Sequence, residues 1–244
     1  MVPVLVFLAI WEIVGRFNLF PGQFFFPPFS VVLKEFYHLT ANGVLGKNFA
    51  SSLARVVIGL CSGSVAGIFV GVIMGWKNVV NKTLSPIISL LYPIPALGWL
   101  PLLMLWIGIK EMLPITIIFI CSFFPVVYNT ATGIRNVDRK YILAAETLGA
   151  SNVRILFKIV IPLALPNIFT GLRLEAGMSW RVLIAAEMVA IPTGIGALLM
   201  QAESLVRVDI IMVCLIVLSI MCLLFEKVFA LLEKRMVGKW SNYA

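Results

Sequence analysis

The segment "LAAETLGASNVRILFKIVIPLALP", residues 143–166, interrupts a chain that otherwise consists mainly of long apolar runs. It contains three charged side chains: Glu146, Arg154 and Lys158. Residues 138–148 are strong helix formers, and Gly149 supplies the left-handed conformation that closes a helix C-terminus. The sequence therefore predicts a helix that begins near Asp138 and ends at Gly149.

A second helix is predicted directly after this turn, over about residues 152–160. Pro162 lacks an amide hydrogen and is predicted to break that helix. The result is a rigid helix-turn-helix elbow, in which the small residues Ala144, Ala145 and Gly149 allow another protein's backbone to approach closely. An amphipathic loop that lies on lipid headgroups is the alternative interpretation of the same residues.

The composition places the chain in a membrane. Of its 244 residues, 61% are hydrophobic and 12% are charged, whereas about a quarter of a soluble domain is charged. A soluble core of this length has no room for so many apolar side chains. The net charge of +8 does not indicate nucleic acid, because the Lys and Arg residues fall in short breaks between apolar runs.

The apolar runs predict an all-α, polytopic membrane protein with about six transmembrane helices, because a span needs roughly 20 apolar residues. The predicted spans are Val2–Phe20, Ser51–Trp76, Leu84–Ile107, Met112–Ile134, Pro166–Ala190 and Asp209–Leu232. No repeat or linker divides them, so residues 1–244 are predicted to form one membrane domain with a cytoplasmic loop at 136–165.

Basic residues predict the orientation. They concentrate after the second and fourth predicted spans and in the C-terminal tail, which are therefore assigned to the cytoplasmic side. Both termini are then cytoplasmic. The first span lacks a small-residue cleavage signature, so we do not expect a cleaved signal peptide.

The elbow resembles the signature cytoplasmic loop of the permeases of binding-protein-dependent ABC importers. That loop has the pattern Glu-Ala-Ala, three residues, Gly, nine residues, Ile, one residue, Leu-Pro. The matching positions in this chain are Ala144, Ala145, Gly149, Ile159 and Pro162. Leu143 and Ile161 stand where the pattern has Glu and Leu, and Glu146 follows Leu143 by one helical turn.

Other stretches are similar to the nitrate, sulfonate, taurine and bicarbonate branch of those permeases: "SLARVVIGL" (52–60), "LLYPIPALGWLPLLMLWIG" (90–108), "SWRVLIAAEM" (179–188) and "LLEKRMVGKW" (231–240). The resemblance implies a homodimer of six-helix subunits in the plasma (inner) membrane of a prokaryote. It also implies cytosolic ABC ATPase subunits that grip the elbow, and an extracytoplasmic solute-binding protein that delivers the cargo.

The third predicted span is a candidate wall of the translocation pathway. It contains Pro93, Pro95 and Pro101, so several backbone carbonyls lose their helical donors. Irregular backbone survives at membrane depth where it packs on protein or lines a wet cavity. We assign Tyr92, Pro93, Pro95 and Trp99 to the candidate pathway, and a packing kink without cargo contact is the alternative.

Charged groups in the fifth predicted span need a partner or water at that depth. They are Arg173, Glu175, Arg181 and Glu187. Arg181 is the candidate for an anion site, because its guanidinium presents a fork to an oxygen pair, although pairing with an acid or snorkelling explains it equally. Trp180, Arg181 and Glu187 complete the candidate pathway, with Glu187 interpreted as structural. The glycine stripe at 63, 67, 71 and 75 is assigned to tight packing within the subunit.

The sequence predicts a transport protein and no enzyme. It contains no phosphate-cradling G-x-x-x-x-G-K-[ST] loop, so ATP is expected on a partner subunit and no cofactor on this chain. The single His38 and the scattered cysteines predict neither a catalytic set nor a metal site. The expected substrate is a small anion such as nitrate, a sulfonate, taurine or bicarbonate. A thiamine-precursor-like or other small organic solute is the alternative, and an ATP-independent channel or transporter is the alternative of another class.

Overall fold

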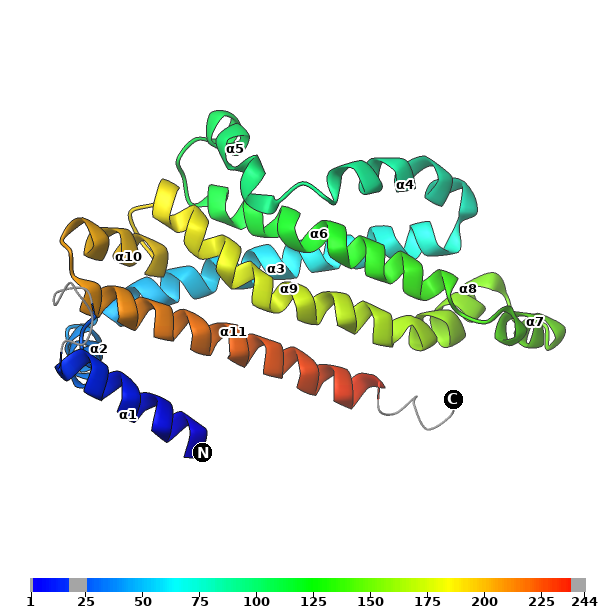
Figure 1. Ribbon diagram of the computed structural model, residues 1–244. Helices are drawn as coiled ribbons and strands as arrows, with labels where there is room; N and C mark the ends of the chain where they lie inside the picture. Colours follow the sequence, from blue (N-terminus) through cyan, green and yellow to red (C-terminus); the bar gives the residue numbers. More distant parts are fainter. Residues whose placement is uncertain (1, 18–25, 238–244) are drawn as a thin grey trace. The chain divides into compact units, whose positions relative to one another are not determined.

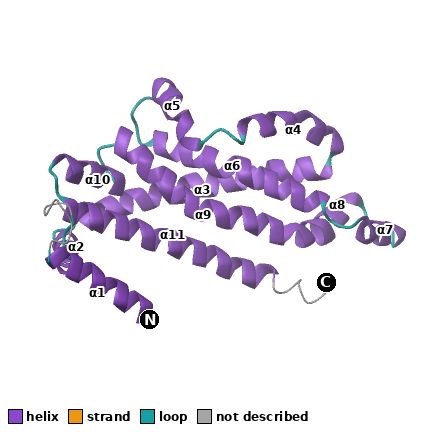
Figure 2. Ribbon diagram, in the orientation of Figure 1, coloured by secondary structure: helices purple, strands orange, loops and turns teal. Residues whose placement is uncertain are grey.

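The computed structural model describes residues 2–17 and 26–237, which are helical throughout apart from connecting turns (Figures 1 and 2). The helices are α1 (Val2–Arg16), α2 (Phe29–Ala41), α3 (Val44–Trp76), α4 (Asn78–Leu91), α5 (Leu100–Ile107), α6 (Met112–Arg135), α7 (Arg139–Thr147), α8 (Asn152–Ile155), α9 (Ile161–Ala190), α10 (Ile195–Ser204) and α11 (Val208–Val237). A 3₁₀ turn (Ala96–Trp99) precedes α5, and a π-helical segment (Leu156–Val160) joins α8 to α9. The prediction of an all-α protein is confirmed.

Within the described residues, four helices are long and apolar enough to cross a membrane, and a bent pair brings the number to five at most. The four are Val44–Trp76, Met112–Arg135, Asn152–Ala190 and Val208–Met236. The first predicted span, at the N-terminus, is not among them, because α1 has 15 residues and reaches only about 22 Å at 1.5 Å per residue. Its predicted end, Phe20, and Lys239 of the basic tail lie outside the described residues.

The third predicted span is a broken pair of helices. Helices α4 and α5 with its 3₁₀ turn are bent by 87° at a break of no more than four residues. Pro93 and Pro95 lie in this break and cannot donate backbone hydrogen bonds, which explains why the helix stops. Pro101 was predicted to interrupt the span as well, but it lies in the first turn of α5, where a missing amide hydrogen costs nothing.

The chain divides into two compact units, residues 1–54 with 184–220, and residues 55–183 with 221–244. In the second unit, the glycine stripe of α3 packs against α6. A Cβ at Gly71 would lie 2.6 Å from the Cβ of Thr130, and one at Gly75 would lie 2.7 Å from the Cβ of Ile134. The predicted close approach within the subunit is therefore confirmed.

Helix α9 also packs against α6 within the second unit. Figure 1 shows α9 in yellow and α6 in green. A Cβ at Gly133 of α6 would lie 2.7 Å from the Cβ of Asn167, and one at Gly171 of α9 would lie 2.9 Å from the Cβ of Asn129. Each helix thus offers a glycine to an asparagine of the other. These contacts hold α9 and α6 at a fixed register.

The elbow forms as the sequence predicts at its first turn. The side chain of Asp138 caps α7 by accepting a hydrogen bond from the backbone amide of Lys140 at 2.9 Å. Gly149 has φ +77°, its amide donates to the carbonyl of Glu146, and the amide of Ala150 donates to the carbonyl of Ala145. This pair of bonds is the Schellman motif, which satisfies the last carbonyls of a helix.

The predicted break at Pro162 is wrong. The helix continues from Asn152 to Ala190 as one candidate span of 39 residues. Leu156–Val160 form a π-helical turn immediately before the proline. A π-turn holds an extra residue, which changes the backbone register at the point where the ring of Pro162 would otherwise meet a carbonyl one turn earlier. The elbow is therefore continuous with the following span.

In the first unit, α2 buries Val32 and Leu39. Phe29, Val32 and Phe36 line an apolar groove together with Val213 and Ile216 of α11. The apolar face of α2 therefore packs against α11. Arg207 also connects α2 to the start of α11, through Glu35 at 3.1 Å and Asp209 at 2.8 Å.

Candidate functional site

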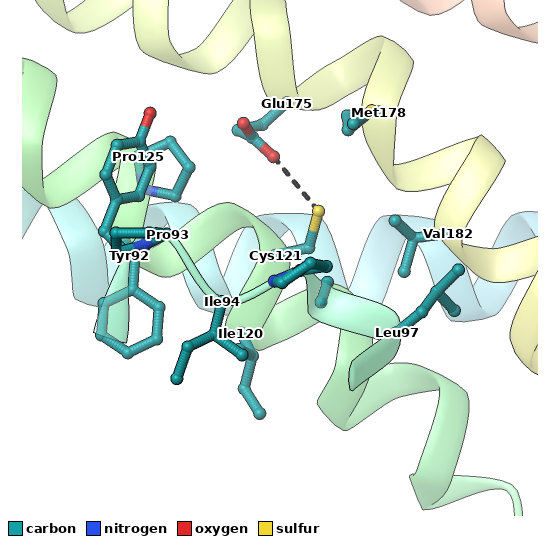
Figure 3. A pocket seen from close by; sticks show the side chains of 13 residues that line it. Tyr92, Pro93, Ile94, Leu97, Ile120, Cys121, Pro125, Glu175, Met178 and Val182 are labelled. Carbon is teal, nitrogen blue, oxygen red and sulfur yellow. Dashed lines mark hydrogen bonds between the residues drawn. The ribbon is translucent and has the colours of Figure 1, made fainter. Parts of the chain in front are cut away.

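A cavity of about 430 Å³ lies in the second unit, beside the broken span (Figure 3). Three segments form its walls: the break and 3₁₀ turn after α4, the middle of α6, and one face of α9. Its lining residues are Tyr92, Pro93, Ile94, Pro95, Ala96, Leu97, Ile120, Cys121, Phe124, Pro125, Glu175, Met178 and Val182. The predicted irregular segment therefore lines a cavity, as its prolines suggested.

Aromatic stacking holds the start of the broken segment against α6. The rings of Tyr92 and Tyr128 are parallel, with an interplanar angle of 8° and centroids 5.8 Å apart. The amide of Tyr92 still bonds the carbonyl of Ile88, and the amide of Ile94 bonds the carbonyl of Leu91. The chain thus leaves α4 through an ordered turn, with Tyr92 as its contact to α6.

Glu175 is the one charged side chain among the described residues that line this cavity. It is 7% exposed, and the thiol of Cys121 donates to its Oε2 at 3.3 Å. Figure 3 shows the two side chains facing each other between α9 and α6. A thiol is a weak donor, so the carboxylate keeps most of its capacity to accept hydrogen bonds.

The predicted pathway residues do not form one site. Tyr92, Pro93 and Pro95 line the cavity, whereas Trp99 does not. Trp180 is buried and packs edge-to-face against Phe225, with centroids 5.3 Å apart. The sequence grouped these residues by their position in spans. Glu175, Met178 and Val182 line the cavity from one face of α9. Their spacing along the helix is the sequence signal that could have distinguished the residues that line the cavity from their neighbours in the same span.

Arg181 lines a different cavity of about 390 Å³, formed by α9 and α11 within the second unit. The lining residues are Thr170, Arg173, Leu174, Gly177, Met178, Arg181, Glu226 and Glu233. Arg173 pairs with Glu226 at 3.3 Å, while Arg181 approaches the sulfur of Met178 at 3.9 Å and also interacts with the thiol of Cys222. Arg181 and Glu175 therefore face different cavities from the same helix.

Glu187 belongs to a buried network of the first unit. The hydroxyl of Ser52 donates to its carboxylate at 2.9 Å, and the backbone amide of Gly196 donates to the same group at 3.0 Å. Ser52 in turn accepts from the amide of Ile195, and Asn48 accepts from the amide of Gly194, both at 2.9 Å. These bonds satisfy the first amides of α10. The structural interpretation of Glu187 agrees with this arrangement.

The elbow carries an apolar groove of about 340 Å³, lined by Tyr141, Ala144, Ala145, Leu148, Lys158, Ile159 and Leu163. Ala145 is buried in a cluster with Ile155 and Val160, which joins α7 to the start of the long helix. Leu148 is 89% exposed at the tip. Glu146 points away from the groove and lines another cavity with Arg135 and Arg139.

In the described part of the chain, no group of three or more His, Cys, Asp or Glu residues lies close enough together to hold a metal ion. The arrangement instead offers cavities beside helices and an exposed apolar elbow. An all-helical chain of several candidate spans, one of them broken beside a cavity, has the features of a polytopic membrane protein.

The chain belongs to the family of binding-protein-dependent transport system inner membrane components, whose model matches residues 63–238. It is thus the permease subunit of an ABC importer, an inner-membrane transport component rather than an enzyme, and a partner ATPase handles ATP. A solute-binding protein is the other partner that this family implies. The resemblance that the elbow indicated is confirmed.

Relatives match over most of the chain. It is 34% identical to the taurine transport system permease protein of Escherichia coli K12, over 95% of this chain and 86% of that protein. It is 33% identical to the nitrate import permease protein of Synechocystis, over 97% and 88%. It is 39% identical to a putative ABC transporter permease protein of Methanocaldococcus jannaschii, over 84% and 78%.

Solved structures share the fold. The inward-facing methionine ABC transporter matches with a TM-score of 0.66, over 76% of this chain and 93% of that chain, at 17% identity. An amino acid ABC transporter solved with histidines matches with a TM-score of 0.64, over 82% and 97%, at 18% identity. At these identities the likeness concerns the fold alone.

Proposed function

We propose that residues 136–165 are the cytoplasmic coupling loop, which receives the movement of the partner ATPase. The exposed side chain of Leu148, which lines the apolar groove of the elbow together with Tyr141 and Ile159, is the observation that carries this proposal, because a contiguous apolar surface on a rigid turn suits burial in a partner. The residues assigned to this contact are Ala144, Ala145, Glu146, Gly149, Ile159 and Pro162.

The orientation follows from the same proposal. The loop, the C-terminal helix end and the start of α1 lie on the cytoplasmic side, and both termini are cytoplasmic. The concentration of Arg and Lys after α3, after α6 and at the end of α11 supports this orientation. The subunit works as a homodimer in one membrane domain, with the translocation pathway beside the broken span.

The proposed cargo is a small anion. The names of the relatives mention taurine, aliphatic sulfonates and nitrate, and bicarbonate is a further candidate of the same kind. The cavity beside the break in the third span is the proposed stretch of the pathway. One of its walls is irregular backbone, which occurs at membrane depth where it packs on protein or lines a water-filled cavity.

Co-purification with the partner ATPase tests the coupling proposal. Leu148→Asp places a charge where an apolar contact is expected and should abolish retention of the ATPase by the purified permease. Leu205→Asp, at a position 71% exposed that the proposed orientation places on the outer side, is the matched control and should retain it. Full retention by Leu148→Asp, or solute movement by the permease without ATP, would end the proposal.

A further inference from the structure

The cavity beside the broken span combines a carboxylate with an excess of hydrogen-bond acceptors. Glu175 is its charged group, and none of the thirteen described residues that line it is basic. Pro93 and Pro95 remove two backbone donors from the lining segment but leave its carbonyls in place. The walls therefore offer acceptors and a negative charge.

A carboxylate that is buried to this extent requires compensation. Glu175 is 7% exposed, and its oxygens receive one described hydrogen bond, from the thiol of Cys121 to Oε2 at 3.3 Å. Burial of an anion with one weak donor is costly, and a cation that enters the cavity would relieve that cost. Such a cation would form charge-assisted hydrogen bonds with the free oxygen.

Aromatic rings that line the same cavity also favour a positively charged ligand. Tyr92 and Phe124 line the cavity, and the faces of aromatic rings attract ammonium groups. A bare anion such as nitrate finds none of these features favourable, because it would meet the carboxylate and the negative faces of the rings. The lining thus distinguishes between an anionic and a cationic end of a cargo molecule.

We propose that this cavity binds the protonated amine of the cargo, with Glu175 as the counter-charge, so that the transported molecule is an amine-bearing compound such as an aminosulfonate rather than a simple anion. This inference rests on the proposed function and narrows its substrate class. Glu175 and Cys121 come from different helices, so the site exists only when α6 and α9 are packed together.

A neutral Glu175 that donates a hydrogen bond to an anion is the competing explanation. The two explanations differ in their response to Glu175→Gln. Glutamine keeps the size and supplies donors but has no charge, so it would preserve a donor role and abolish a counter-charge role. The substitution therefore separates the two chemistries in one variant.

The experiment uses the permease together with its ATPase in lipid nanodiscs, with taurine and isethionate as probes. Both are two-carbon sulfonates, and they differ only in having an ammonium or a hydroxyl group. Equilibrium binding and thermal unfolding are measured with each probe and with nitrate. We expect taurine to bind at least tenfold more tightly than isethionate, and Glu175→Gln to weaken taurine binding at least tenfold with isethionate little changed.

Glu203→Gln is the matched control, since Glu203 is an exposed carboxylate on α10, and it should bind taurine like the wild type. Equal binding of taurine and isethionate, no binding of either, or undiminished taurine binding by Glu175→Gln would overturn the inference. Retention of the ATPase and ATP-driven uptake are measured in parallel. A complex that couples ATP to uptake but is indifferent to Glu175 contradicts only the amine site, whereas Glu175-dependent binding without coupling contradicts only the proposed function.

Discussion

Ser52 and Glu187 are 135 residues apart in sequence, and the hydroxyl of Ser52 lies 2.9 Å from both carboxylate oxygens of Glu187. Both side chains are fully buried. Ser52 also accepts from the amide of Ile195, so it connects α3, the end of α9 and the start of α10. Together with the side chains of Asn48 and Glu187, this hydroxyl accepts hydrogen bonds from the first amides of α10.

Ser52→Ala should therefore loosen the start of α10. It removes the donor to Glu187 and the acceptor for Ile195, and we expect a loss of about 1–3 kcal/mol of stability, the usual cost of leaving buried polar groups unsatisfied. Faster amide hydrogen exchange at residues 194–196 would report it. Ser51→Ala is the control, because the hydroxyl of Ser51 bonds only the carbonyl of Lys47 in its own helix. Equal exchange in both variants would contradict the role of Ser52.

Gly71→Ala should destabilise the contact between α3 and α6. The new Cβ would lie 2.6 Å from the Cβ of Thr130 and 2.9 Å from the carbonyl oxygen of Val127, so the helices would have to separate. We expect a cost of about 1–3 kcal/mol, typical of overpacking. Gly46→Ala, in the same helix with no atom within 4 Å of the new Cβ, is the control. It should unfold at the wild-type temperature or above, and a matching loss in both variants would refute the packing explanation.

Gly149→Val should uncouple ATP hydrolysis from uptake. A β-branched residue at φ +77° is strained by about 1–2 kcal/mol, so the Schellman turn opens and the two helices of the elbow lose their fixed angle. The measurement is the ratio of ATP hydrolysed to solute imported by the reconstituted transporter, which we expect to rise severalfold. Gly149→Asn should largely keep the wild-type ratio, since asparagine tolerates this conformation. An unchanged ratio in the valine variant would argue against the coupling role.

Arg181→Ala tests whether the cavity between α9 and α11 binds anions. The guanidinium lines the same cavity as the pair of Arg173 and Glu226, and its described partners are the sulfur of Met178 and the thiol of Cys222. If it attracts the sulfonate of the cargo, its removal should raise the KM for taurine uptake severalfold, and Arg181→Lys should recover part of the loss. Arg173→Ala is the control, because Arg173 already has a carboxylate partner. Unchanged uptake by Arg181→Ala would remove the anion site.

Local backbone chemistry made parts of this structure predictable from sequence. Gly149 closes α7 because only a residue that tolerates positive φ suits that position, and the prolines at 93 and 95 break the third span because they lack amide hydrogens. Pro162 did not follow the same rule. Its cost depends on the register of the preceding turn, and the π-helical segment that accommodates it has no strong sequence signal.

The cavity was harder to predict because it depends on which helix faces meet. Arg181 and Glu175 are six residues apart in one apolar run, and periodicity alone does not say which of them faces α6. The contact with Cys121 decides the matter for Glu175, and it joins residues 54 positions apart. Tertiary packing therefore decides that Glu175 and Arg181, which belong to the same predicted span, line different cavities.

The π-helical turn has a mechanical consequence. Because it replaces a break at Pro162, the backbone runs without interruption from Ile155 in the elbow to Glu175 in the cavity, which is about 30 Å at a rise of 1.5 Å per residue. The π-turn and Pro166, which lies inside α9, are the two places in that stretch where the helix can bend. We therefore expect a tilt of the elbow to reach the Glu175 carboxylate along this helix, with residues 156–166 as the place where the helix bends.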